Sequence, residues 1–375
     1  MTPLLLLAVV IFLAYTNGAN DNFKGVATLF GSRAASYQQA LLWATLTTFA
    51  GSLTALWISK GLVEVFSGNG LMPVSVAADP AFLLAVGLGA ALTVFLATAT
   101  GFPISTTHAL TGALVGAGWM AAGTYLRLGK LGQAFFLPLV LSPLLAVGVT
   151  AMVYPAFRAV RERLGVTKQL CLCVGQKREP VVLQQGGMMV LQSTGAALTV
   201  GELTECMEEY RGVLFGVNVQ QWLDALHYLS AGAVSFARGV NDTPKIVALL
   251  VAAKGLGFSL SLGLATIGTG MALGGLLNAR KVAMTMSERI TTLSHGQGFT
   301  ANLVTAFLVI VASRWGLPVS TTHVSCGSLF GMGVVTKQAR WATIRTILLA
   351  WFGTLPLAAL IAAAVMVLIR NRFFL

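Results

Sequence analysis

The sequence predicts an all-α polytopic membrane protein made of two inverted repeats, each of about five to six transmembrane segments with broken helices, and a small cytoplasmic insertion between them. Three observations support this fold class. The composition is 56% hydrophobic and 10% charged, with a mean hydropathy of +0.81, so polar side chains cannot cover the surface as in a soluble globule. Apolar runs recur through both halves, and two motifs return in the same order.

Apolar runs of roughly 20 residues mark spanning helices, and shorter runs mark half-helices. In the first half they lie near residues 2–16, 37–59, 80–100, 103–124 and 134–157. In the second half they lie near residues 218–237, 243–276, 298–313, 317–336 and 343–369. The 243–276 run is too long for one span, so we expect a break at Lys254–Gly257 and about ten to twelve membrane segments in all.

These runs divide the chain into three expected parts: an N-terminal transmembrane repeat (1–157), a central cytoplasmic domain or linker (158–211) and a C-terminal transmembrane repeat (212–375). The first run lacks a basic start and a convincing cleavage site, so we expect a retained span instead of a cleaved signal. The central part is polar, and short alternating pieces within it suggest a few strands.

The net charge of +12 could indicate nucleic acid, but the basic residues lie between apolar runs, where they set orientation. Arg158, Arg161 and Arg163 follow the fifth run. They place the central part in the cytoplasm and the N-terminus outside, in a cell inner or plasma membrane. The four cysteines form no disulfide framework, so we expect reduced thiols.

The first repeated motif reads GFPISTTH at residues 101–108 and GLPVSTTH at residues 316–323. Proline suits the first position of a helix, and a neighbouring serine or threonine can cap the free amides. Each copy therefore predicts a helix N-terminus, whose dipole and unpaired amides favour anions. Two such termini meeting at the membrane midplane could bind a desolvated tetrahedral oxyanion. The candidate donors are Ser105, Thr106, Thr107, Ser320, Thr321 and Thr322.

Alternatively, these hydroxyls only cap their own helices. A histidine ends each copy, at His108 and His323, without a further histidine or cysteine at metal-ligand spacing. A structural role in packing the turn, direct ligation and proton carriage all stay open for these two side chains.

The second repeated motif reads GAND at residues 18–21 and GVND at residues 239–242. A carboxylate at membrane depth is costly, so Asp21 and Asp242 are expected to face a cavity or a cation. Each follows a Gly-x-Asn sequence that would interrupt a helix, and unwound carbonyls beside an acid suit a sodium ion. The alternative is a loop aspartate in water.

Because each half has an odd number of spans, the two repeats are expected to enter the membrane from opposite sides and to be inverted.

Lys24 and Lys245 each stand three residues after the motif aspartate, a helical spacing that permits an ion pair. They are either interfacial lysines or ammonium groups that lie near the anion or compete for the aspartate in place of a cation. Arg238, just before the second GxND motif, has the same ambiguity.

Four matched motifs in this order resemble the inorganic phosphate transporter (PiT) family, and the resemblance covers nearly the whole chain. It implies phosphate import coupled to sodium or protons, a homodimer, an extracellular N-terminus and a site where the repeats meet. It also implies that Asn20, Asp21, Asn241 and Asp242 hold cation and substrate, and that the two Ser-Thr-Thr runs donate to the anion. After the signature, many sodium-coupled members resemble Val-Ala-Asn, whereas this chain has Asn-Phe-Lys and Thr-Pro-Lys, and the second form is closer to bacterial members with a lysine at that place. Lys24 and Lys245 therefore leave the coupling ion and sulfate open.

The sequence is thus interpreted as a secondary active transporter that imports phosphate with a cation gradient, with sodium favoured over protons. Asp21, Asp242, Asn20 and Asn241 are the expected sodium ligands. The hydroxyls of the two Ser-Thr-Thr runs are the expected anion ligands, together with Lys24, Lys245, Asn20 and Asn241. A sulfate permease of the same fold, an intramembrane hydrolase and a passive anion channel are the alternatives. No catalytic residue, no cofactor beyond the coupling ion and no nucleic acid is expected; phosphate or sulfate and membrane lipid are the expected partners.

Overall fold

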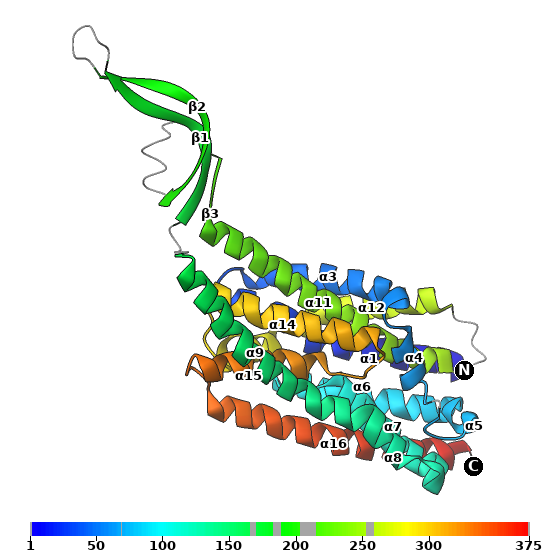
Figure 1. Cartoon of the computed structure of the whole chain (residues 1–375). Helices are drawn as coiled ribbons and strands as arrows, with labels where there is room; N and C mark the ends of the chain where they lie inside the picture. The colour runs from blue at the N-terminus through cyan, green and yellow to red at the C-terminus, as the bar shows by residue number, and fades with distance from the viewer. Residues whose placement is uncertain are drawn as a thin grey trace.

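A computed structural model describes residues 2–68, 70–165, 170–182, 189–202, 215–252 and 259–373. Long helices form one bundle, and a small sheet extends from one end of it (Figure 1). Seven of the described helices are long and apolar enough to cross a membrane. This confirms the predicted fold class, in which the ten to twelve expected segments included half-helices as well as full spans.

The helices of the first half are α1 (Thr2–Asp21), η1 (Asn22–Gly25), α2 (Ala27–Gly31), α3 (Tyr37–Ile58), α4 (Lys60–Phe66), α5 (Val74–Ala77), α6 (Pro80–Thr100), α7 (Thr106–Ala122), η2 (Gly123–Tyr125), α8 (Leu128–Leu131), η3 (Gly132–Phe136) and α9 (Leu137–Arg163). Those of the second half are α11 (Val219–Ala252), α12 (Leu260–Asn278), α13 (Arg280–Met284), η4 (Thr285–Arg289), α14 (His295–Arg314), α15 (Thr321–Val335) and α16 (Trp341–Phe373). The predicted break at Lys254–Gly257 lies outside the described residues, between α11 and α12.

The sheet is antiparallel, with strand order β2-β1-β3. Its strands are β1 (Leu170–Val182), β2 (Met189–Glu202) and β3 (Phe215–Asn218). The first two fall in the central part of the chain, where the sequence suggested strands, and β3 lies beyond residue 211. The boundaries and the cytoplasmic position of this part stay predictions.

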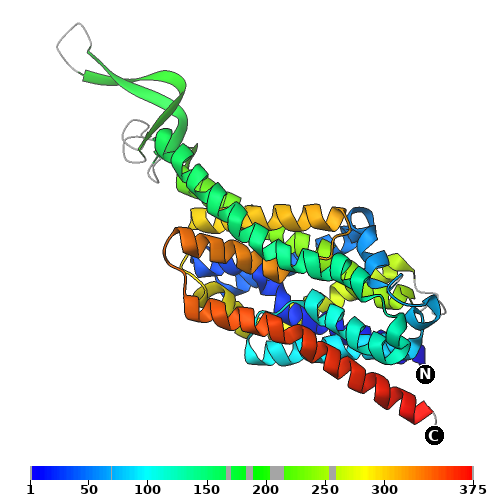
Figure 2. The same ribbon diagram turned by 60° about the horizontal axis from the view of Figure 1, so that its bottom comes forward.

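Corresponding helices of the two halves run in opposite directions, as inverted repeats require. Helix α1 begins at the end of the bundle marked N, whereas α11 begins at the opposite end beside β3 (Figure 1). Likewise α9 ends at the sheet, whereas α16 ends at the chain terminus marked C (Figure 2). The two chain termini therefore lie at the same end of the bundle.

The repeats are interlocked, because the main helix pairs join one half to the other. Helix α1 packs on α12 and α11 on α3, while α7 packs on α16 and α15 on α9. Glycines allow the close approach. A Cβ atom added to Gly18 would lie 1.9 Å from Met271 O, and one added to the equivalent Gly239 would lie 2.2 Å from Thr48 O. Small residues of this kind let helix backbones pack closely in membranes.

The first repeated motif forms a break between two helices in each half. Gly101 and Gly316 adopt positive φ angles of 79° and 68°, which suit glycine. Ser105 then caps α7 by accepting from His108 N at 3.0 Å, and Ser320 caps α15 by accepting from His323 N at 3.1 Å. The predicted helix starts are thus confirmed. However, the prolines lie in the extended segments before the caps instead of at the first helical position.

The second repeated motif differs between its copies. Residues 18–21 end α1 and lead into the 3₁₀ turn η1, as predicted, but residues 239–242 lie inside the continuous helix α11. The expected interruption of the second copy is therefore wrong. Pro244 has no N–H for the carbonyl of Val240, and the hydroxyl of Ser59 donates to that carbonyl at 2.7 Å instead. This bond satisfies the freed carbonyl, so the helix can continue.

We predict that Gly116→Ala destabilises the protein. Its new Cβ would lie 1.9 Å from Ala359 O, a backbone atom of the partner helix. Overpacking of this kind costs about 1–3 kcal/mol. Gly148→Ala is the matched control, since it also lies in a helix and has nothing within 4 Å, and alanine favours helix by about 1 kcal/mol. Melting in detergent should show a lower Tm for Gly116→Ala only; equal Tm values would contradict the interlocked packing.

Candidate functional site

The two motif aspartates meet inside the bundle. Asp21 and Asp242 are only 1% and 2% exposed, so neither is a loop aspartate in water. The amide of Asn17 joins them: its Nδ2 lies 3.1 Å from Asp21 Oδ2 and 3.4 Å from Asp242 Oδ2. One carboxylate from each repeat therefore contributes to a single buried cluster.

Lys24 lies in a cage of oxygen atoms. The lysine is buried and forms the ion pair with Asp21 that the spacing predicted. Its Nζ atom lies within hydrogen-bonding distance of Asp21 Oδ1 (2.5 Å), Thr322 Oγ1 (2.6 Å), Asn20 Oδ1 (2.8 Å) and Ile104 O (2.8 Å). The carboxylate, amide and carbonyl come from the lysine's own repeat, and the hydroxyl comes from the other repeat.

Lys245 has equivalent surroundings in the second repeat. It is buried as well, and its Nζ atom lies 2.7 Å from Val319 O, 2.8 Å from Thr107 Oγ1 and 3.4 Å from Asp242 Oδ1. Again the carboxylate and carbonyl belong to its own repeat, while the hydroxyl crosses from the other. Burial excludes the interpretation of both residues as interfacial lysines, and each lysine ties one repeat to the other.

The hydroxyl residues divide into two groups. The two serines cap their own helices, as the capping interpretation of the hydroxyl residues predicted. The threonines instead reach the cluster: Thr107 donates to Val319 O at 3.3 Å and Thr322 donates to Ile104 O at 2.8 Å. Thr106 and Thr321 donate to the aspartates, at 3.3 Å to Asp21 Oδ2 and 3.4 Å to Asp242 Oδ2.

Asn20 and Asn241 hold the broken-helix segments. Asn20 donates to Phe102 O at 3.0 Å and accepts from Ile104 N at 3.2 Å. Asn241 donates to Val319 O at 3.2 Å. The two asparagines thereby fix the carbonyls of residues 104 and 319 that accept from the lysines.

Two further cluster residues, Asn17 and Arg238, were not among the sequence candidates, although Arg238 had been noted as ambiguous. Each stands four residues before the motif aspartate of its repeat, and this shared spacing was the signal that could have found them. Arg238 Nη2 donates to Asn17 Oδ1 at 3.0 Å, and Nη1 donates to Asn22 Oδ1 at 2.9 Å. The equivalent positions of the two repeats thus contact each other.

The cluster carries more positive than negative charge. Three basic side chains, Lys24, Lys245 and Arg238, face two carboxylates, and all five are buried. Buried charges require partners. Arg238 Nε is 3.8 Å from Asp242 Oδ2 and has no hydrogen-bond partner within the described residues. An anion would supply both the missing charge and the missing acceptor.

The motif histidines pack together next to the cluster. The rings of His108 and His323 are 4.3 Å apart between centroids, and His323 stacks on Trp351 at 3.9 Å. Trp351 in turn donates to Pro103 O at 3.0 Å. This packing across the repeats favours the structural interpretation of the two histidines.

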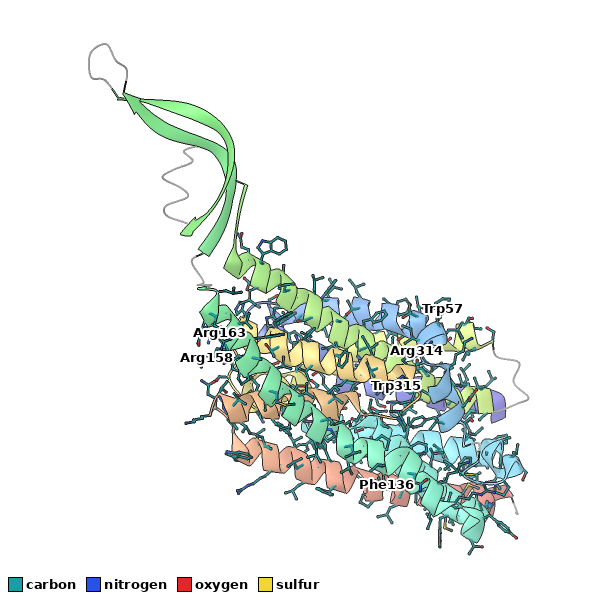
Figure 3. The ribbon with its side chains drawn as sticks, viewed as in Figure 1. Trp57, Phe136, Arg158, Arg163, Arg314 and Trp315 are labelled. Atoms are coloured by element: carbon teal, nitrogen blue, oxygen red, sulfur yellow. The ribbon has the colours of Figure 1, made fainter. Side chains whose placement is uncertain are left out.

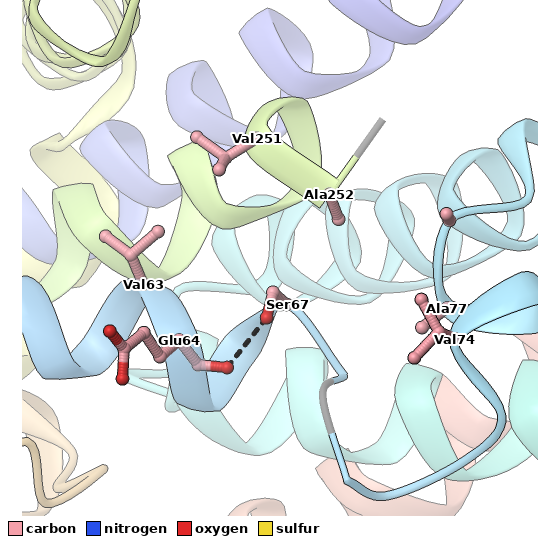
Figure 4. A pocket seen from close by; sticks show the side chains of 8 residues that line it. Val63, Glu64, Ser67, Val74, Ala77, Val251 and Ala252 are labelled. Atoms are coloured by element: carbon pink, nitrogen blue, oxygen red, sulfur yellow. Dashed lines mark hydrogen bonds between the residues drawn. The ribbon is translucent and has the colours of Figure 1, made fainter. Parts of the chain in front are cut away.

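Two cavities differ in their suitability for an anion. The one in Figure 4 is lined mainly by apolar side chains, and among its described lining residues the one ionisable side chain is that of Glu64, whose carbonyl accepts from Ser67 Oγ at 2.7 Å. The other is lined by Arg280 and Lys281 and reaches Thr98, which accepts from Asn20 Nδ2 at 3.0 Å. Only the second has the charge to attract an anion and a contact with the cluster.

Comparisons with known proteins agree on one family. Residues 17–362 match the family described as the phosphate transporter family (PHO4). A putative phosphate permease of Thermococcus kodakarensis is 29% identical over 97% of this chain and 97% of its own. A probable low-affinity inorganic phosphate transporter of Rhizobium meliloti is 29% identical over 96% of this chain and 95% of its own.

A solved structure, described as the sodium-dependent phosphate transporter, has the same fold. It is 21% identical, covers 99% of both chains and superposes with a TM-score of 0.75. The family match spans both repeats and contains all four motifs. The chain is therefore a transporter and not an enzyme, and it belongs to the phosphate transporter family.

Proposed function

We propose that this protein is a secondary active transporter that imports inorganic phosphate, coupled to a cation gradient, with the anion bound between the inverted repeats. The excess of positive charge in the buried cluster is the observation that carries this proposal. Membership of the family and the names of the relatives support phosphate as the substrate.

The anion is held by donors from both repeats. Arg238 offers its Nε, which has no hydrogen-bond partner among the described residues. Thr106 and Thr321, which now donate to the aspartates, can turn their hydroxyls to a bound oxyanion. Thr107 and Thr322 fix the surrounding carbonyls and lysines. Ser105, Ser320, Asn20 and Asn241 support these groups through the helix caps and the broken segments.

The cavity lined by Thr98 adjoins this site. Its volume is about 570 Å³, and Arg280 and Lys281 line it. Positive side chains along a cleft raise the local concentration of an anion. A hydrogen bond joins Thr98 to Asn20, so phosphate could pass between this cavity and the cluster only if that bond opened.

Sodium is the coupling ion that the sequence favoured, with Asp21, Asp242, Asn20 and Asn241 as ligands. The name of the solved relative supports sodium, and protons are the alternative. The lysines bear on this choice, since each ammonium already lies against the aspartate of its repeat. Sodium would have to share these carboxylates with the ammonium groups or displace them.

The orientation is also part of the proposal. Arg158 and Arg163 lie at the end of the bundle from which the strands extend (Figure 3). Basic residues are enriched on the cytoplasmic side, so the sheet would be cytoplasmic and the N-terminus outside, in a cell inner or plasma membrane. Lipid would contact the exposed apolar side chains, and a homodimer is proposed from the family resemblance.

Uptake of radiolabelled phosphate into proteoliposomes tests the proposed activity. We expect accumulation above equilibrium when a cation gradient is imposed, and little competition from excess sulfate. Separate sodium and proton gradients identify the driving ion. Strong sulfate competition would favour the sulfate permease, and downhill flux without accumulation would indicate a channel.

Asp21→Asn and Asp242→Asn are each expected to abolish coupled uptake without lowering expression. Either change removes the charged partner of a buried lysine and so alters the charge of the site at which cation and anion are proposed to bind. Glu64→Gln removes an exposed carboxylate and serves as the control. Normal uptake in both aspartate variants would contradict the assigned site.

Thr107→Val and Thr322→Val are expected to weaken phosphate transport to a similar degree, because the two threonines make equivalent contacts across the repeats. Loss of a hydrogen bond to a charged group costs about 1.5–3 kcal/mol, so kcat/KM should fall roughly tenfold or more. Thr100→Val, at an exposed position, is the control. A large effect in one variant alone would contradict the symmetric arrangement.

A further inference from the structure

We propose that Lys24 and Lys245 are tethered cations that occupy the two repeat-related cation positions, so that phosphate binds this site without sodium. This inference rests on the proposed function for its substrate and departs from the sodium assignment made on the sequence. It concerns which ion neutralises Asp21 and Asp242 while the anion is bound.

The surroundings of Lys24 are those of a small hard cation. Carboxylate, amide, carbonyl and hydroxyl oxygens are the ligands that such ions take in proteins. Four of these oxygens lie 2.5–2.8 Å from Lys24 Nζ. An ammonium has only three N–H donors, so the cage offers one acceptor more than a lysine can use, whereas a spherical ion would contact all four.

Lys245 has a cage of the same construction. A carbonyl, a hydroxyl and a carboxylate surround its Nζ atom at 2.7–3.4 Å. Each lysine stands three residues after its aspartate, so the positive charge comes from the same position in both repeats. The repetition indicates that both halves have an equivalent cation position and that a lysine occupies it in each half.

The same contacts argue against direct binding of the anion by the lysines. The oxygens around each ammonium are sufficient for its three donors. Arg238 differs, because its Nε has no hydrogen-bond partner in the described part of the chain. The lysines therefore act as fixed counter-charges, and the arginine and the hydroxyls contact the anion.

Binding of inorganic phosphate to the purified full-length protein tests this inference. Affinity is measured in sodium chloride and in choline chloride at equal ionic strength. The wild-type protein should bind phosphate equally, within about twofold, in both salts. Lys24→Ala empties one cage, so its affinity should fall at least tenfold in choline and recover in sodium. Lys60→Ala removes an exposed lysine and should behave as wild type.

A second measurement does not depend on the folding of a variant. Binding of radioactive sodium to the wild-type protein, with phosphate present, should show no saturable site. Saturable sodium binding that phosphate strengthens, or phosphate binding that requires sodium, would overturn the inference, as would a Lys24→Ala defect that sodium does not rescue. Absence of phosphate binding in both salts would instead refute the proposed function on which the inference rests.

Discussion

Pairing of buried charges between the two repeats is the interaction on which the rest of the structure depends. Five ionisable side chains of the cluster, those of Asp21, Asp242, Lys24, Lys245 and Arg238, are buried inside the bundle, where unpaired charge is costly. The lysine of each repeat is satisfied by its own aspartate and by a threonine of the other repeat. Neither half could bury its own lysine in this way alone. Because helices of one half pack on helices of the other, the required threonines lie within reach of the lysines.

The two repeats differ at one position of the site, and this difference determines its charge. If the repeats were identical, the position four residues before each aspartate would hold two asparagines or two arginines. The chain has Asn17 in one repeat and Arg238 in the other, and they bond to each other at 3.0 Å. Because only one repeat has an arginine at this position, the site has one excess positive charge and avoids repulsion between two guanidinium groups. A site of this kind suits one anion shared by both repeats.

The sequence was sufficient for the fold class, the helix starts at the two hydroxyl motifs and the spacing of both ion pairs. These features are local, since a cap or a three-residue spacing depends on neighbouring residues. The packing of helices of one half on helices of the other was not predictable from the sequence, because it depends on which helix backbone each glycine contacts. The helix through residues 239–242 was missed for a similar reason: the hydroxyl that replaces the lost Pro244 hydrogen bond comes from distant Ser59. Likewise, only the geometry separates the capping serines from the cluster threonines.

The central claim is that one anion binds between the repeats, and the most direct measurement is an experimental structure with arsenate, a heavier analogue of phosphate. The arsenate oxygens should accept hydrogen bonds from Arg238 and from threonine hydroxyls of both α7 and α15. An arsenate bound only beside Arg280 and Lys281, or by residues of a single repeat, would contradict this claim.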